Sequence, residues 1–402
     1  MMKKRSTRLG LAAIVVVAAL VAATVASASR RATPIKLMVI AAVATPIQNY
    51  PDAKAGAEAA AAAINKAGGV KGRPIEIEFC NTQSQANVAT ACDRQAVADG
   101  VVAVVGHSST LTTLEEPILQ QGGVPDVGLF SFGNAVDWTN PNVFPLVGGV
   151  AASYMGIPFA MKQLHKKRFV IFYQDVPSAQ QNAKNAANAA KAAGLPVVCQ
   201  ILMAGSTTDF APLAEKLKQC NADSVMFINS PGVSGGLMRT ATSLGVHPLW
   251  SHNNGSLGEP EVAQIGSPTE GMLLAAPFPT YRDNQAGVKQ WVKEMTAAGS
   301  NDPTLLKPNG FNSWLAVHAI AKLAQTMKGD LTAATLTAAM RATKKPIDLY
   351  GLVSWVPGLK GPAAFPRFSS VKVNFLIVKG GQEVAYPGLK SAFVLKLMHY
   401  VR

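Results

Sequence analysis

Charged and aromatic residues are scarce in this sequence, and cysteines are few. Of 402 residues, 15% are charged, 7% are aromatic and four are cysteines, whereas 49% are hydrophobic. Such a composition is typical of a globular α/β protein and excludes a disordered or fibrous chain. Because a single core rarely grows beyond about 250–300 residues, the length predicts two lobes.

Beyond the first residues, the chain lacks any apolar run long enough to span a membrane. The start itself has the three parts of a signal peptide: a basic leader, the apolar run Leu9–Val25, and Ala26-Ser27-Ala28. We expect cleavage after Ala28 and export to a periplasmic or other extracytoplasmic compartment. An uncleaved anchor is the alternative, because a run of about 17 residues is at the lower limit for a bilayer span. No cysteine lies near the cleavage site, which argues against a lipoprotein.

The positive charge is not clustered. The chain carries +14, and removing the four basic residues of the leader leaves +10, spread over the whole sequence. Nucleic-acid binding needs a basic patch or stripe, so we expect no nucleic-acid partner. The six histidines are dispersed, and none belongs to an H-E-x-x-H motif. The cysteines do not have C-x-x-C spacing. The sequence therefore predicts neither a metal site nor a cofactor.

The four cysteines form two close pairs in sequence. In an oxidising compartment this spacing predicts two local disulfides, Cys80–Cys92 and Cys199–Cys220. Four buried free thiols are the alternative.

From Ile35 the hydrophobic pattern alternates between strands and helices, and the alternation restarts after residue 150. Two such runs predict an α/β fold of two Rossmann-like lobes with parallel sheets. The long segment that follows them predicts that the chain crosses between the lobes more than once, through a multi-strand hinge. We expect the first lobe to comprise 33–150 and 278–351, and the second lobe to comprise 151–277 and 352–402. The final segment is β-rich, with strands expected at Leu352–Val356, Val371–Val378 and Phe393–Met398.

Several stretches resemble the branched-chain amino-acid and amide-type solute-binding proteins of ABC transporters, which have the type I periplasmic binding fold. The stretches that carry the resemblance are Gly56–Ile75, Val102–Ser109, Thr208–Asp223, Asn309–Ala319 and Gly351–Val356. The resemblance implies a Venus-flytrap architecture that captures a small ligand between the lobes and delivers it to a membrane permease. It also implies that the chain catalyses no reaction, and we expect a monomer.

In the first lobe, hydroxyl groups follow a buried strand and a glycine just before a helix. Ser108, Ser109 and Thr110 at this helix start suit a carboxylate or a similar oxyanion, and the family uses this loop in that way. Ordinary helix capping is the alternative. The resemblance also suggests Tyr50 as an aromatic wall, and Ser131, Gly133 and Asn134 as further contacts.

In the second lobe, two strands end in polar residues, Asn229-Ser230 and Asn253-Asn254. The amino-acid binders of the family place an acidic residue near the second of these positions to meet the ligand's ammonium group. A neutral amide does not compensate a buried positive charge. An amino acid, an amide and a carboxylate therefore all stay open as ligands.

Two other functions are alternatives to transport: ligand sensing and hydrolysis. A receptor that senses a ligand would have the same fold. A hydrolase is disfavoured, because Gly106-His107-Ser108-Ser109-Thr110 lacks the glycine that a nucleophile elbow needs two positions after its serine.

Overall fold

The computed structural model describes residues 32–45, 48–205, 207–368 and 371–400. The predicted signal peptide lies outside these residues. Among the helices that are described, none combines the length and the apolar character that crossing a membrane requires.

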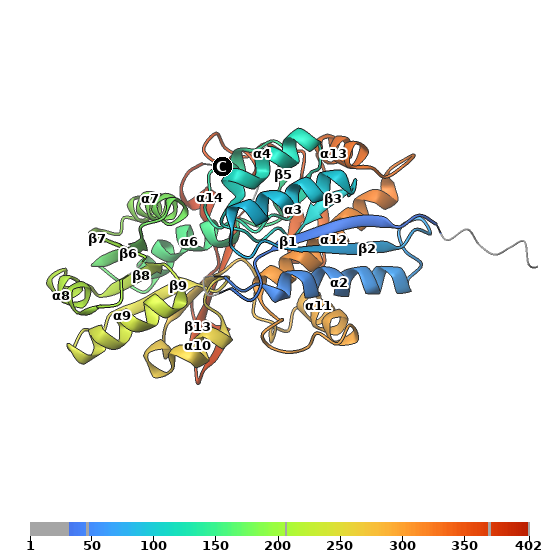
Figure 1. Cartoon of the computed structure of the whole chain (residues 1–402). Helices are drawn as coiled ribbons and strands as arrows, with labels where there is room; N and C mark the ends of the chain where they lie inside the picture. Colours follow the sequence, from blue (N-terminus) through green and yellow to red (C-terminus); the bar gives the residue numbers. More distant parts are fainter. Residues whose placement is uncertain (1–31, 46–47, 206, 369–370, 401–402) are drawn as a thin grey trace, which may run out of the picture.

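The first lobe is built on a five-stranded parallel sheet in the order β2-β1-β3-β4-β5 (Figure 1). Its strands are β1 (Ile35–Ala41), β2 (Ile75–Asn81), β3 (Ala103–Val105), β4 (Asp126–Val127) and β5 (Val143–Phe144). The helices of this lobe are α2 (Pro51–Lys66), α3 (Ala86–Ala98), α4 (Thr112–Gly122), α5 (Val136–Thr139), α11 (Ala286–Ala297), α12 (Pro308–Thr326) and α13 (Ala333–Ala342). In β1, Leu37 and Val39 join the core with α2 and α12, whereas Met38 and Ile40 join the core with α3 and α4. From Leu37 to Ala41 the strand is apolar, as a strand covered on both faces requires, whereas Lys36 near its start is partly exposed and pairs with Glu78.

The second lobe contains a larger sheet in the order β14-β13-β10-β9-β8-β6-β7, and β15 pairs with β13. Its strands are β6 (Phe169–Gln174), β7 (Val197–Met203), β8 (Ser224–Ile228), β9 (Leu249–Asn253), β10 (Leu273–Ala276), β13 (Lys372–Lys379), β14 (Gln382–Ala385) and β15 (Ala392–Phe393). Its helices are α6 (Gly149–Gln163), α7 (Pro177–Ala193), α8 (Ala211–Gln219), α9 (Pro231–Ser243), α10 (Glu259–Ile265), the 3-10 turn η1 (Ser267–Thr269) and α14 (Val394–Leu397). Strands β6 to β10 are parallel to one another, whereas β13 pairs antiparallel with β10, β14 and β15. The predicted two-lobed α/β fold is confirmed, with one sheet mixed instead of parallel.

The chain passes between the lobes after β5, after β10, and again before β13 (Figure 1). One continuous hydrophobic cluster extends from α2 and α12 in the first lobe to α6 and α7 in the second. The lobes are therefore joined by shared apolar packing as well as by the covalent chain. At the first passage Gly149 has a φ of +56°, and a Cβ there would lie 2.6 Å from the backbone of Ser131. Only glycine fits this position without a shift of the backbone.

Two of the expected late strands differ from prediction. The segment Phe393–Met398 forms only the short strand β15 and then helix α14, because Val394, Leu395 and Met398 are the buried residues. That spacing is helical and does not alternate. Strand β12 (Val353–Trp355) pairs with β11 (Ile347–Leu349) beside α12 and so lies with the first lobe, although the predicted boundary at 352 assigned it to the second. The positive φ angles of Tyr350 and Gly351 make the tight turn of this hairpin.

Both predicted disulfides are present. Cys80–Cys92 ties β2 to α3, and Cys199–Cys220 ties β7 to the end of α8. They close loops with sequence separations of 12 and 21 residues. Each bridge therefore connects two adjacent elements of its own lobe.

Replacing either cysteine pair with serine is expected to lower the free energy of unfolding by about 3 kcal/mol, because an unfolded loop of this length regains its entropy. Urea denaturation of each double variant measures the loss. A reducing agent breaks both bridges, so it should lower the unfolding free energy of the unmodified protein by about the sum of the two losses. Thiol titration of the denatured, unreduced protein should detect no free thiol. Two or more free thiols in that assay would contradict the pairing.

Candidate functional site

The lobes meet at loops that follow the carboxyl ends of their strands. The Asn182 amide of α7 donates to the Phe132 carbonyl of the first lobe at 2.8 Å. Lys307, just before α12, forms an ion pair of 3.0 Å with Glu261 of α10 in the second lobe. In an open α/β sheet, ligands bind at this end of the strands. The junction between the lobes is therefore the candidate site.

The loop from Gly106 to Leu111 contains the three predicted hydroxyl groups, and each has its own contact. The Ser108 hydroxyl is fully buried and donates to the Gly106 carbonyl and to Asn309 Oδ1, both at 3.1 Å. The Ser109 hydroxyl accepts from the Leu111 N–H at 3.0 Å and so forms a turn just before α4, whose N-cap Leu111 receives no side-chain capping bond. Ser108 thus holds the loop against α12, and Ser109 shapes the start of α4.

Thr110 is the most accessible of the three, since its side chain is only half-buried. Its Oγ1 accepts a hydrogen bond of 2.9 Å from the Gln48 amide. Gln48 in turn accepts from the Ser84 hydroxyl at 3.3 Å, so residues from three loops of the first lobe form one polar chain. Gln48 and Ser84 were not among the predicted site residues, because they lie far from Thr110 along the chain.

Aromatic rings line the first-lobe side of the junction. Tyr50 and Phe132 have ring centroids 5.1 Å apart, and Phe130 lies 5.7 Å from Phe132. Burial raises the pKa of the Tyr50 hydroxyl, so the group is neutral. A Cβ on Gly255 of the second lobe would lie 2.9 Å from the Phe130 ring, which shows how closely the second-lobe loop approaches this wall.

The predicted contacts at residues 131–134 hold their own loop in place. The Ser131 hydroxyl donates to Asp137 at 2.7 Å, and the Gly133 N–H donates to the same carboxylate at 3.3 Å. The Asn134 amide donates to the Thr110 carbonyl at 2.9 Å. Burial raises the pKa of Asp137 to about 6, opposed by these hydrogen bonds. The Asp137 network therefore positions the loops of Ser131 and Thr110 relative to each other.

In the second lobe, Asn253 and Asn229 are linked through His252. Burial lowers the pKa of His252 to about 4, so its ring is neutral; Nδ1 accepts from the Asn253 N–H and Nε2 donates to the Asn229 carbonyl. The Asn253 amide donates to the Tyr154 hydroxyl at 2.7 Å, and its oxygen accepts from the Ser256 N–H at 2.8 Å. This asparagine is thus held rigidly between α6 and the loop after β9.

The other polar pair, Asn229-Ser230, lies where β8 ends and α9 begins. Asn229 Oδ1 accepts from the Ser234 hydroxyl, and Asn229 Nδ2 is buried without a partner among the described residues. Ser230 is half-buried and makes no side-chain capping bond to α9. Both residues lie on the second-lobe side, beside His252.

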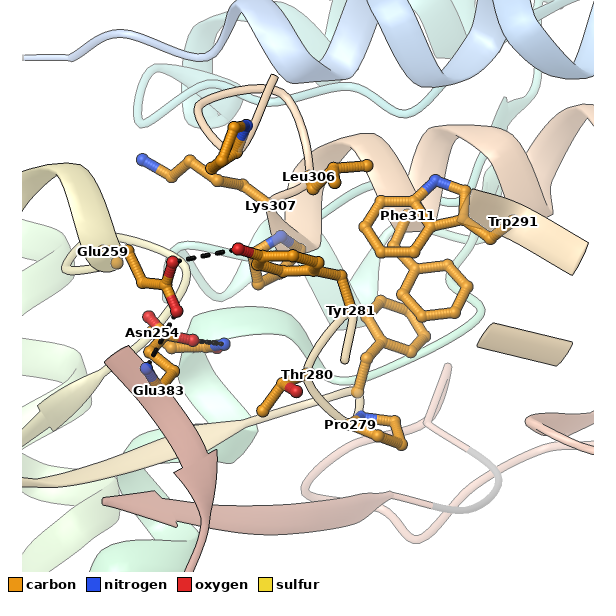
Figure 2. Close-up of a pocket in the computed structure, with 14 residues that line it drawn as sticks. Asn254, Glu259, Pro279, Thr280, Tyr281, Trp291, Leu306, Lys307, Phe311 and Glu383 are labelled. Atoms are coloured by element: carbon orange, nitrogen blue, oxygen red, sulfur yellow. Dashed lines mark hydrogen bonds between the residues drawn. The ribbon is translucent and has the colours of Figure 1, made fainter. Parts of the chain in front are cut away.

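Asn254 points toward an acidic group that the sequence analysis missed. Its amide nitrogen lies 3.4 Å from Glu383 of β14, whose side chain is buried (Figure 2). Burial raises the pKa of Glu383 to about 8. Glu259 accepts from the Glu383 N–H at 2.9 Å and from the Tyr281 hydroxyl at 3.1 Å, so it joins β14 to the second passage between the lobes (Figure 2).

A small pocket opens at this passage. Asn254, Tyr281, Trp291, Lys307 and Glu383 are among its lining residues, which come from both lobes (Figure 2). Its volume of about 20 Å³ admits a water molecule but not a metabolite. In the present arrangement of the lobes, this pocket therefore has no room for a ligand larger than water.

Two lobes that present polar loops to each other across a hinge define a bilobed binding-protein fold. Residues 34–363 match the family model described as periplasmic binding protein. The chain belongs to the periplasmic binding protein family.

Similar proteins agree with this assignment. The leucine-, isoleucine-, valine-, threonine-, and alanine-binding protein of Pseudomonas aeruginosa is 30% identical over 268 residues, which cover 65% of this chain and 71% of that protein. Leu/Ile/Val-binding protein homolog 3 of Brucella melitensis is 29% identical over 237 residues, 57% of this chain and 63% of the relative, so the match spans less than two thirds of that relative. The crystal structure of a possible leucine/isoleucine/valine-binding protein from Rhodopirellula baltica has the same fold, with a TM-score of 0.76, 15% identity, and coverage of 91% of this chain and 98% of that one.

The buried Glu383 gives stability a distinct pH dependence. Its pKa rises from the ordinary 4.5 to about 8 on folding, so the folded protein binds a proton that the unfolded chain lacks between these values. This contribution is complete below about pH 4.5 and is lost as the pH rises through about 8. In wild type, the unfolding free energy should fall as the pH rises from about 4.5 to about 8. In Glu383→Gln this fall should be less steep, by at most about 1.4 kcal/mol per pH unit.

Urea denaturation at several pH values measures the slope. Glu215→Gln is the matched control, because Glu215 is exposed on α8. Asp52, Asp93 and Asp137 also have raised pKa values, so the slope is compared between variants and not read from one protein. Equal slopes in wild type and Glu383→Gln would contradict the assignment.

Proposed function

We propose that this chain is the extracytoplasmic solute-binding component of an ABC importer, and that it captures a small carboxylate-bearing ligand between its lobes. The observation that carries the proposal is the convergence of polar loops from both lobes at one junction. The ligand would sit between the Thr110 loop and the Asn253 loop, and closing the lobes would bury it.

The first lobe supplies an anchor for the ligand's carboxylate. Thr110 offers a half-buried hydroxyl, and Ser109 lies next to it, with the N–H groups at the start of α4 close by. Because the Thr110 oxygen accepts from Gln48, its O–H can donate to the carboxylate when the ligand enters. A hydrogen bond to a charged group is stronger than one between neutral groups, which favours this contact.

The aromatic wall suits an apolar ligand body. Tyr50 and Phe132 lie at the junction. The names of the two relatives above describe them as a binding protein, or a homologue of one, for leucine, isoleucine and valine. We therefore place aliphatic amino acids first among the candidates, and their carboxylate analogues second.

The ammonium group of an amino acid needs a negative partner in the second lobe. Asn253 and Asn254 are neutral, but Glu383 lies behind Asn254 at 3.4 Å, and the Asn254 oxygen is buried without a partner among the described residues. An ammonium group would bond to Asn254 Oδ1 and lower the pKa of Glu383 toward its ionised form. If Glu383 stayed neutral, it would not attract the ammonium group, and a carboxylate ligand without that group would bind as tightly as the amino acid.

The remaining parts of the proposal concern partners. The closed surface of the two lobes would dock on a membrane permease, the chain would act as a monomer, and it would catalyse no reaction. Its family membership supports a binding role.

A thermal-shift and calorimetric screen tests the ligand. We expect L-leucine, L-isoleucine or L-valine to raise the melting temperature by several degrees at a concentration of about a hundred times the dissociation constant. 4-Methylpentanoate lacks the ammonium group of leucine, and L-leucinamide lacks the carboxylate. The amide should fail to bind, and the comparison of leucine with 4-methylpentanoate measures what the second lobe contributes.

Thr110→Val and Ser109→Ala are each expected to weaken the best ligand by about ten- to a hundred-fold, since each removes a hydrogen bond to a charged group. Ser243→Ala is the matched control, because that hydroxyl bonds to the Thr240 carbonyl at the exposed end of α9. Unchanged affinity in both first-lobe variants would overturn the anchor. Absence of any shift with ligand-free protein across the panel would overturn the ligand class.

A further inference from the structure

A group of ionisable side chains lies buried inside the first lobe, outside the junction. Its members are His107 after β3, Asp126 on β4, Asp93 on α3, and Glu115 and Glu116 on α4. All five have 0% exposure. They lie beside the apolar layer between the sheet and helices α3 and α4, which includes Met38, Ile40 and Leu119.

These side chains are nearly devoid of partners. Seven of the eight carboxylate oxygens, and His107 Nε2, have no hydrogen bond within the described part of the chain. The exception is Asp126 Oδ2, which lies 2.7 Å from His107 Nδ1. A buried carboxylate without a partner costs several kcal/mol, so folding would not retain four of them without compensation.

The imidazole alone does not provide that compensation. A protonated His107 carries +1 against four carboxylates, and its other contacts are long: Nε2 lies 3.4 Å from Glu115 Oε1, and Nδ1 lies 3.5 Å from Glu116 Oε1. Either protons or a cation must neutralise the cluster.

The geometry around His107 favours a cation. Asp126 accepts from the Nδ1 side of the ring, which leaves the lone pair of Nε2 directed at Glu115 and Asp93. A carboxylate that fixes a histidine tautomer in this way is the usual outer partner of a metal-binding imidazole. One ligand atom each from Asp93, His107 and Glu115 lie within 4.8 Å of one another, close enough to surround one ion.

We propose that His107 Nε2, Glu115 and Asp93 bind a divalent transition-metal ion, Mn²⁺ or Zn²⁺, with Asp126 and Glu116 as outer-shell partners. An imidazole ligand selects these ions over Ca²⁺ and Mg²⁺, which prefer oxygen ligands alone. The ion would join α3, α4 and the loop after β3. His107 directly precedes Ser108, and its carbonyl accepts from the Phe130 N–H at 2.9 Å. The same ion would therefore fix the position of the Ser109-Thr110 loop relative to the aromatic wall.

Metal analysis of the exported protein, purified without a histidine tag and desalted, tests the site. We expect about one equivalent of Mn²⁺ or Zn²⁺ per chain. In Glu115→Gln the metal content should fall to about a tenth or less. Glu58→Gln is the matched control, since Glu58 is an exposed residue of α2 in the same lobe and should leave the metal content unchanged. Anomalous scattering at the metal edge should give a peak beside His107 Nε2.

A refolding series covers the case in which Glu115→Gln fails to fold. Wild-type protein is unfolded in guanidinium and refolded with EDTA, Mn²⁺, Zn²⁺ or Ca²⁺. Mn²⁺ or Zn²⁺ should raise the melting temperature by about 5 °C or more over EDTA, whereas Ca²⁺ should not. Refolding to the same stability in EDTA with no retained metal would overturn the site and indicate protonated carboxyl groups. Retention of Ca²⁺ instead would overturn the choice of ion.

Discussion

The close contact between α2 and α12 is the constraint on which the junction depends. A Cβ on Gly56 would lie 1.9 Å from the Gly310 carbonyl oxygen, and the Gly310 N–H donates to Asp52 at 2.7 Å. This backbone approach fixes the start of α12, where Lys307 and Asn309 reach the second lobe and the Ser108 loop. A larger residue at either glycine would push α12 outward and displace both contacts together.

The fold could be predicted because its determinants are local. Strand β1 is apolar except for Lys36, the alanine-rich α7 ends at Gly194 in the left-handed conformation, and each disulfide joins neighbouring elements. The order of strands and helices then leaves few topologies. The failures were also local: in Phe393–Met398 a short apolar run suited either a strand or a helical turn, and only its burial on one side decided between them.

Much of the candidate site could not be predicted, because its determinants are distant along the chain. Thr110, Asn134, Asn253 and Asn254 follow strands, and that position alone makes them candidates in the sequence. Glu383, which approaches Asn254 from 129 residues away, stands on a β-hairpin with no polar pattern to mark it. Asn182 is one of several asparagines on α7, and only the contact with Phe132 distinguishes it. The acidic cluster around His107 was missed for the same reason, since its five side chains come from four separate parts of the chain without a spacing rule.

The polar contacts between the lobes contribute little free energy, so a ligand that binds at the junction could replace them. The polar bonds between the lobes, such as Asn182 to Phe132, contribute about 0.5–1.5 kcal/mol each, because water replaces them when they break. The Lys307–Glu261 pair is mostly buried, with side chains 8% and 23% exposed, so the cost of desolvating its charges offsets much of their attraction. Their sum is a few kcal/mol, the range in which differential ligand affinity shifts a two-state equilibrium. Because the first lobe is braced by a disulfide and by the α2–α12 contact, such a ligand would move the lobes about the hinge without deforming the loop that anchors it.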